Sequence, residues 1–199
     1  AKDEWDSISL LTHWCADEIR YSGISMGPGE GYTLHTGDMT FTDRCGVCKD
    51  KAGMLIAMLR AAGFESYAAM TMAGSRIDAV PADQFNHCVT ALKLEDGTFR
   101  MYDPTWVPYN NDIWSKLETE QHYLIGSPEG EILSRIPYSP PEESPMKVRH
   151  QARLTPAGDL DGSFRLEGRG AMDGRLRRIV TRTPRPNRTT PASGSSSPA

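Results

Sequence analysis

The chain has 199 residues, which is enough for one domain of ordinary size and part of a second. Its formal net charge of -4, from 22 Lys and Arg against 26 Asp and Glu, lacks the basic excess that nucleic-acid binding requires. No apolar run is long enough to cross a membrane, so we expect neither a nucleic-acid partner nor membrane insertion. Four cysteines are too few for a disulfide scaffold in a chain of this length.

The first elements that the sequence predicts are a helix over residues 3–21 and a glycine-rich loop over residues 22–43. The helix follows from one periodic apolar face and from acidic residues in its first turn. Cys15 lies on that face, where a thiol behaves as a small buried apolar group. The loop has no clear period, and a loop of this length in a compact domain commonly lines a functional site.

A buried helix is predicted to begin at or beside Cys48 and to end at Gly63. Its apolar residues follow the i, i+3, i+4, i+7 spacing of one helix face at Leu55, Met58, Leu59 and Ala62. In the first turn of a helix, unpaired N–H groups and the positive end of the macrodipole favour a thiolate over a thiol. Asp50 opposes this effect with its negative charge, which is screened if the side chain points to solvent.

Strands are predicted next over residues 66–72, 87–94 and 98–103, with a turn between the last two. A two-residue loop at that turn would place His87 and Asp103 on opposite faces of the strand pair. A type I turn followed by Gly97 as a left-handed bulge residue would instead place both side chains on one face. Glycine is the residue that such a bulge requires, so we expect the second register.

Composition divides the chain into four parts. Residues 1–137 form the main domain, and the Pro-rich, polar stretch over 138–146 is typical of a linker. Alternating apolar residues from 147 indicate extended strands, too few to close a core, so 147–180 is interpreted as the start of an all-β module. The Arg, Pro, Thr, Ser and Gly composition of 181–199 predicts a disordered tail.

Three of these residues could together carry nucleophilic acyl transfer. A cysteine nucleophile needs a base within hydrogen-bond reach and a third group that orients the base. Cys48 on a helix, His87 opening a strand and Asp103 ending the next strand meet that requirement in type and order. The backbone N–H of Cys48, at a helix N-terminus, is expected to be the first oxyanion donor. The other histidines, including His35, are interpreted as structural or solvated.

The residues around these positions resemble the transglutaminase-like superfamily. Residues 46–64 resemble the nucleophile segment of that superfamily. Its His and Asp segments resemble Asn86-His87-Cys88-Val89 and Tyr102-Asp103-Pro104-Thr105-Trp106 of this chain. The resemblance covers about residues 5–135 and is closest to a bacterial branch flanked by β-sandwich modules. In that branch the residue before the cysteine is often Asp, whereas this chain has Val47.

The resemblance implies a papain-like α+β core in which the cysteine helix packs on an antiparallel sheet. It also implies a Cys48–His87–Asp103 triad, a protein or peptide substrate, flanking β-sandwich modules, and a periplasmic or otherwise extracytoplasmic location. The superfamily includes proteases, amide hydrolases, crosslinking transferases and inactive members, so the fold alone does not define the reaction. Hydrolysis is favoured over crosslinking, because water is the default acceptor unless a site excludes it.

Three alternatives remain open. The chain could be an inactive binding or scaffold module of the same fold. Cys45 and Cys48 form a C-x-x-C, which could be a dithiol redox motif, although the preceding helix and loop differ from a thioredoxin βαβ unit. Zinc could be bound by these two cysteines with His87 and Cys88, but adjacent strand residues point to opposite faces. The acyl-transfer interpretation requires no metal and no organic cofactor.

Overall fold

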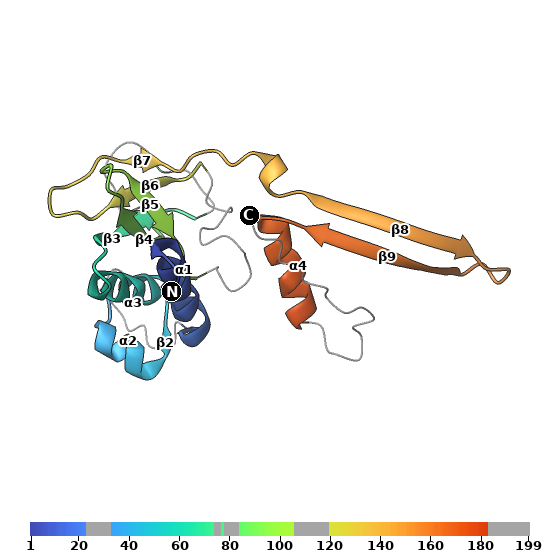
Figure 1. Ribbon diagram of the computed structural model, residues 1–199, viewed down its shortest axis with the longest axis horizontal. Coiled ribbons are helices and arrows are strands. Elements are labelled where there is room, and N and C mark those ends of the chain that lie inside the picture. Colours follow the sequence, from blue (N-terminus) through green and yellow to red (C-terminus); the bar gives the residue numbers. More distant parts are fainter. Residues whose placement is uncertain (23–32, 74–76, 78–83, 106–119, 183–199) are drawn as a thin grey trace.

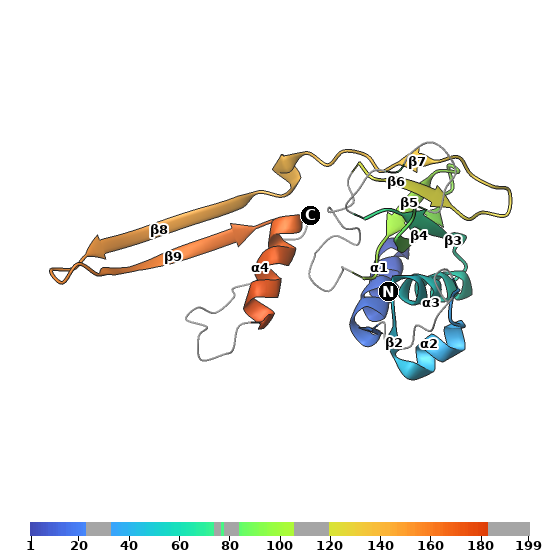
Figure 2. The same ribbon diagram turned by 180° about the vertical axis from the view of Figure 1, so that it is seen from behind.

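The computed structural model describes residues 1–22, 33–73, 77, 84–105 and 120–182 (Figure 1, Figure 2). Its helices are α1 (Glu4–Glu18), α2 (Gly37–Asp43), α3 (Cys48–Ala61), α4 (Ala171–Arg182) and a 3-10 turn at Pro141–Glu143. Its strands are β1 (Arg20–Tyr21), β2 (Cys45–Gly46), β3 (Ser66–Thr71), β4 (His87–Lys93), β5 (Phe99–Tyr102), β6 (His122–Ile125), β7 (Ser134–Arg135), β8 (Met146–Leu154) and β9 (Leu160–Gly168). Of the tail predicted over residues 181–199, the first two residues belong to α4, contrary to the prediction, and residues 183–199 lie outside the described residues.

The main sheet has five antiparallel strands in the order β5-β4-β3-β6-β7, and α1 and α3 pack on one of its faces (Figure 1). This arrangement is the predicted α+β core, with the cysteine helix packed on an antiparallel sheet. Strands β3, β4 and β5 match the three that were predicted. The sequence pattern did not predict β6 and β7, which extend the sheet on the far side of β3.

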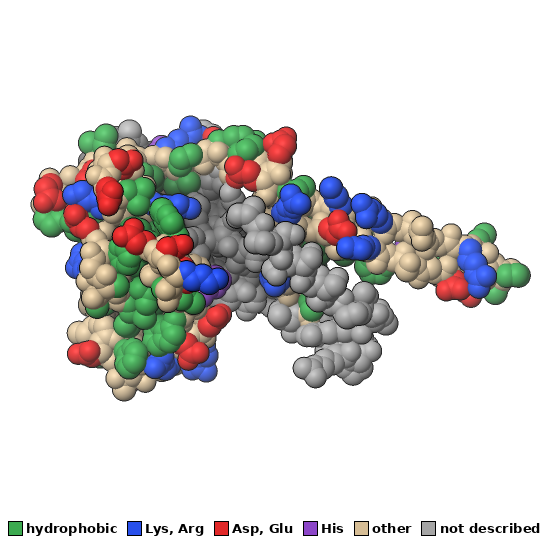
Figure 3. Space-filling model, in the orientation of Figure 1, with side chains coloured by type: hydrophobic (Ala, Val, Ile, Leu, Met, Phe, Trp, Pro, Cys, Tyr) green, Lys and Arg blue, Asp and Glu red, His purple; other side chains and the backbone are tan. Residues whose placement is uncertain are grey.

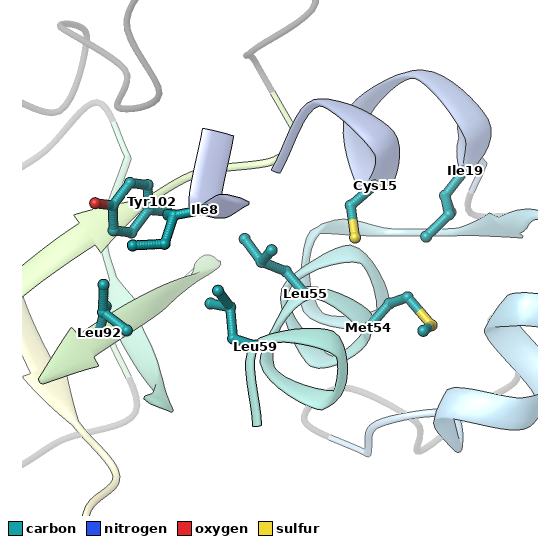
Figure 4. Packing of buried hydrophobic residues seen from close by; sticks show 8 residues of the cluster. All are labelled: Ile8, Cys15, Ile19, Met54, Leu55, Leu59, Leu92 and Tyr102. Atoms are coloured by element: carbon teal, nitrogen blue, oxygen red, sulfur yellow. The ribbon is translucent and has the colours of Figure 1, made fainter. Parts of the chain in front are cut away.

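The core between helices and sheet is built from the apolar faces of α1 and α3. Leu55 and Leu59 of α3 are fully buried and lie beside Leu92 and Tyr102 of the sheet (Figure 4). Cys15 is also fully buried, as predicted from its place on the face of α1. A smaller apolar cluster covers other positions of the sheet, at Ala69, Val89, Ala91, Met101 and Ile125. Both helices are therefore held to the sheet by buried apolar area, the dominant favourable term in folding.

Helix α3 begins and ends where the sequence predicted. Cys48 is its first residue, and Gly63, with φ of 92°, occupies the left-handed conformation that follows its C-terminal cap. Ala62, predicted to share the buried face, is exposed. The predicted loop over 22–43 is wrong in its second half, because Gly37–Asp43 forms the short helix α2 with Thr36 as its N-cap. Seven residues span only two helical turns, too few to establish a helical period in the sequence. The N-capping threonine was the feature that could have indicated this helix.

The C-terminal part contains a long hairpin of β8 and β9 that extends away from the main sheet (Figure 1). One face of the hairpin is apolar, because Val148 pairs with Leu166 and Leu154 pairs with Leu160, and all four are exposed. Lys and Arg side chains lie along the hairpin (Figure 3). The strands agree with the β interpretation of 147–180, but Ala171–Arg182 is the helix α4 and not a further strand.

The division into a domain over 1–137, a linker over 138–146 and a partial β module stays a prediction. Within the described residues, no helix combines the length and the hydropathy that a membrane crossing demands.

Candidate active site

Cys48 opens the buried helix α3, directly after the short strand β2. Val47, in an extended conformation, is the N-cap residue, so Cys48 is the first residue of the helical turn. The side chain of Cys48 is neither buried nor fully exposed. The N–H groups of a first helical turn have no partners within the helix, and the macrodipole is positive there. A thiolate at this position is stabilised by both effects.

His87 and Asp103 meet at the ends of two paired strands. The Nε2 atom of His87 lies 2.9 Å from Oδ2 of Asp103, and their side chains are 7% and 0% exposed. The Asp103 carboxylate is also fixed by the backbone N–H of Thr105, which donates to Oδ1 at 2.9 Å. A buried carboxylate with two donors holds the imidazole in one orientation.

The turn between β4 and β5 decides this meeting, and its predicted geometry is confirmed. Gly97 has a φ of 82°, and its N–H donates to the carbonyl of Leu94 at 2.9 Å. The N–H of Leu94 donates to the carbonyl of Thr98 at 2.8 Å. The strand register pairs Lys93 with Phe99, the second of the two registers considered. His87 and Asp103 consequently share one face of the strand pair.

The thiol of Cys48 completes this group of three side chains. Burial raises the pKa of the Cys48 thiol. Hydrogen bonding to His87, the charge of His87 and the backbone N–H groups of Cys88 and Lys49 lower this pKa by more than burial raises it, so the net pKa is lowered. These groups favour the negative sulfur and disfavour the neutral one. The structure thus brings together the three predicted site residues.

The other cysteines lie in different environments. Cys15 and Cys88 are buried, and burial raises the pKa of each of these thiols to about 12. Cys45 is partly exposed on β2, and all four cysteines are free thiols. Across the described ranges, no group of three His, Cys, Asp or Glu side chains is arranged to hold a metal ion.

The sequence left open whether the Asp50 side chain points to solvent, and the structure decides it. Asp50 does not point to solvent, the condition under which its charge would be screened, but is 1% exposed. Its Oδ2 accepts the N–H of Val47 at 2.9 Å, and its Oδ1 accepts the N–H of His35 at 3.1 Å. The Nδ1 atom of His35 lies 3.2 Å from the same oxygen. Asp50 therefore ties the preceding loop to the N-cap of α3, as the acidic residue of a capping box does.

Gly46 is required by this arrangement. A Cβ atom at position 46 would lie 2.5 Å from Cβ and 2.9 Å from Oδ2 of Asp50. We expect Gly46→Ala to displace the Asp50 side chain, removing the cap and straining the start of α3. The expected loss in free energy of unfolding is about 2–4 kcal/mol, from overpacking and a lost cap together. Urea denaturation monitored by circular dichroism measures it.

Gly53→Ala in the same helix is the matched control. A Cβ atom there would meet only Leu34, at 3.8 Å, which is ordinary contact. Alanine is preferred to glycine inside a helix by about 0.5–1 kcal/mol, so this variant should be slightly stabilised. Equal stability of the two variants would contradict the role assigned to Gly46.

Two further groups near the site were not predicted. Lys51 is 2% exposed, and its Nζ donates to the carbonyl of Ala16 at 2.9 Å and of Ile19 at 2.6 Å. It thereby joins α3 to the C-terminal end of α1, where unpaired carbonyls favour a cation. Burial lowers the pKa of Lys51 to about 8. Tyr21 follows this end of α1 and lies against Cys48. No local sequence pattern marks either contact.

Comparison with known proteins agrees with this fold. The family model described as the transglutaminase-like superfamily matches residues 1–110. A search of curated proteins gives no match. Similar solved structures include a candidate protease from Parabacteroides distasonis, with 18% identity and a TM-score of 0.50, covering 70% of this chain and 26% of that one. Another is a candidate cysteine protease from Cytophaga hutchinsonii, with 23% identity and a TM-score of 0.42, covering 53% of this chain and 32% of that one.

This chain therefore spans about a third or less of the length of these two structures. The family model covers more than half of the chain and includes the segments of Cys48, His87 and Asp103. This chain belongs to the transglutaminase-like superfamily.

Proposed function

We propose that this chain catalyses cysteine-dependent acyl transfer on amide bonds of protein or peptide substrates, with water as the acceptor. The observation that supports this proposal is the continuous series of contacts from Asp103 through His87 to Cys48 at the first residue of α3. Each contact matches one requirement of the chemistry: an oriented base, a base beside the nucleophile, and a site that favours the thiolate.

In the first half of the reaction, the sulfur of Cys48 attacks the amide carbonyl carbon, and a tetrahedral intermediate forms. The proton of the thiol passes to His87, whose Nε2 is bound to Asp103, so Nδ1 is the nitrogen that accepts it. The C–N bond then breaks, and the imidazolium returns the proton to the leaving amine. The product of this half is a thioester on Cys48.

In the second half, water attacks the thioester while His87 accepts a proton from it. The C–S bond breaks, the carboxylic acid leaves, and the Cys48 thiolate is regenerated. Asp103 stabilises the imidazolium in both halves without accepting the proton itself. The reaction balances with an amide and water as the only reactants, so it needs no redox partner and no organic cofactor.

The test is to map which cysteine reacts first with a limiting dose of iodoacetamide across a pH series. Cys48 should be alkylated at mildly acidic pH, because its pKa is lowered. Cys15 and Cys88, with pKa values of about 12, should react little under the same conditions. Peptide mass spectrometry quantifies each site.

His87→Ala is the informative variant for this test. Removing the imidazole removes the contacts that lower the pKa, so burial should shift the reaction of Cys48 to higher pH. If Cys48 reacts no faster than the other three cysteines in the unmodified chain, the proposed acyl-transfer activity is ruled out. The inactive binding or scaffold module of the same fold would then be the remaining interpretation.

A further inference from the structure

Strand β4 begins at His87, and the pairing of strands holds the backbone of that residue from the side of β3. The ladder between β3 and β4 ends with Thr71 opposite His87. The ladder between β4 and β5 covers Thr90–Lys93, so it starts three residues after His87. The base of the proposed triad therefore lies at the end of its strand, where local opening costs least.

Asn86, the residue before His87, closes this end of the strand. Its backbone N–H donates to the carbonyl of Thr71 at 3.2 Å. Its side chain forms two hydrogen bonds with the backbone of Ala73, because Oδ1 accepts the N–H at 2.8 Å and Nδ2 donates to the carbonyl at 3.2 Å. Asn86 and Ala73 are 13 residues apart, so these bonds join the two ends of the connection between β3 and β4.

An amide side chain suits this position. Asparagine carries an acceptor and a donor in one group, the combination that a peptide unit presents. The opposite orientation of the amide would set donor against donor and acceptor against acceptor, so the two bonds with Ala73 define one orientation. The exposed side chain of Asn86 thus continues the hydrogen bonding of β3 beyond the start of β4 without entering the core.

The imidazole of His87 is fixed separately by Asp103, whose Oδ2 lies 2.9 Å from Nε2. This bond orients the ring, while the bonds of Asn86 and of β3 hold the backbone that carries the ring. A displacement of about 1 Å at a reacting group can lower a rate by about 10²-fold, so a base needs its backbone held as well as its side chain. We propose that Asn86 is a positioning residue for His87, a role that rests on the acyl-transfer function proposed above.

Asn86→Ala tests this role through the pH dependence of Cys48. Burial raises the pKa of the Cys48 thiol, but a hydrogen bond and the charge of His87 lower it. A displaced imidazole should therefore move the alkylation of Cys48 by iodoacetamide to higher pH, in the direction expected for His87→Ala but by less. At alkaline pH, where the thiolate is fully formed, the alkylation rate should be unchanged. Acylation by p-nitrophenyl acetate at neutral pH should be about 10–10²-fold slower.

Asp96→Ala is the matched control at the other end of β4. The side chain of Asp96 is also exposed, and its Oδ1 accepts the N–H of Thr98 at 2.9 Å and the hydroxyl of Thr98 at 2.6 Å. This variant loses bonds that brace the turn after β4 and keeps those of Asn86. It should leave the pH dependence and the acylation of Cys48 unchanged. Circular dichroism checks the fold of both variants before the rates are compared.

Hydrogen exchange in the unmodified chain gives an independent measurement of the same bonds. The N–H of Ala73 donates to Oδ1 of Asn86, so it should exchange more slowly than an exposed amide. Exchange as fast as that of an exposed amide would show that this bond does not form. It would overturn the proposal even if Asn86→Ala does not fold.

The other outcomes are equally decisive. An unchanged pH dependence of Cys48 in Asn86→Ala, with or without a loss of stability, would make Asn86 a structural residue only. An equal shift in Asp96→Ala would mean that any loosening of β4 has the same effect, and slower alkylation at alkaline pH would place the effect at Cys48 itself; each overturns the proposal. Failure of Cys48 in the unmodified chain to react with either reagent would overturn the acyl-transfer function itself, and it is seen before any variant is made.

Discussion

Replacing Cys48 with alanine is expected to abolish hydrolysis of any amide or ester that the chain accepts, whereas Cys45→Ser should leave most of it. Without the sulfur no thioester can form, and His87 and Asp103 have no nucleophile to activate. Removing the nucleophile of a serine protease triad costs on the order of 10⁶-fold in kcat, and a loss of that order is expected here. Cys45 lies on β2 and supplies none of the three side chains of the proposed triad.

This pair of variants separates the acyl-transfer function from the dithiol alternative. A dithiol oxidoreductase needs both cysteines of the C-x-x-C, so the two substitutions would then be equally damaging. The measurement is release of nitrophenolate from p-nitrophenyl acetate, followed by hydrolysis of a peptide library analysed by mass spectrometry. Residual activity in Cys48→Ala equal to that of the unmodified chain would contradict the assignment of the nucleophile.

The second large effect expected is a loss of stability at alkaline pH. Burial raises the pKa of Cys15 and of Cys88 from 9.0 to about 12 in the folded chain. Below pH 9 both states are protonated and the stability is fully present. As the pH rises from 9 toward 12, the unfolded chain loses these protons while the folded chain keeps them. Each thiol then costs about 1.4 kcal/mol of stability per pH unit.

Lys51 acts in the opposite direction within part of this range. Its pKa falls from 10.5 to about 8 on folding, so the folded chain loses a proton first and stability rises between these values. The contribution of Lys51 cancels when the unmodified chain is compared with a Cys15→Ala/Cys88→Ala double variant, because both proteins retain Lys51. Between pH 9 and pH 11 the unmodified chain should lose several kcal/mol more than the double variant.

Urea denaturation at successive pH values, with a reductant present, gives the free energies of unfolding for this comparison. Cys45→Ser serves as the control, because it leaves both buried thiols in place and should retain the steep alkaline loss. Parallel pH profiles for the unmodified chain and the double variant would show that the two thiols do not ionise on unfolding as expected.

Local spacing along the chain is enough to predict α3 and the turn between β4 and β5. The apolar period after Cys48 and the stop at Gly63 specified α3, because a helix repeats every 3.6 residues and ends where glycine permits a left-handed turn. The glycine at position 97 specified the bulge that aligns His87 with Asp103, because the side-chain period of a strand is two. The family motifs lie on these same segments.

The other side chains around the nucleophile are brought there by contacts between segments that are distant along the chain. Asp50 binds His35 across 15 residues, Lys51 binds the carbonyl of Ile19 across 32, and Tyr21, just after the same end of α1, lies near Cys48. A charged residue on a helix is ordinarily solvated, and no sequence pattern marks Asp50 or Lys51 as buried. Both are buried instead: Lys51 binds carbonyls at the C-terminal end of α1, and Asp50 binds the N–H groups of Val47 and His35. Such contacts join segments that are distant along the chain, and no periodic pattern records them.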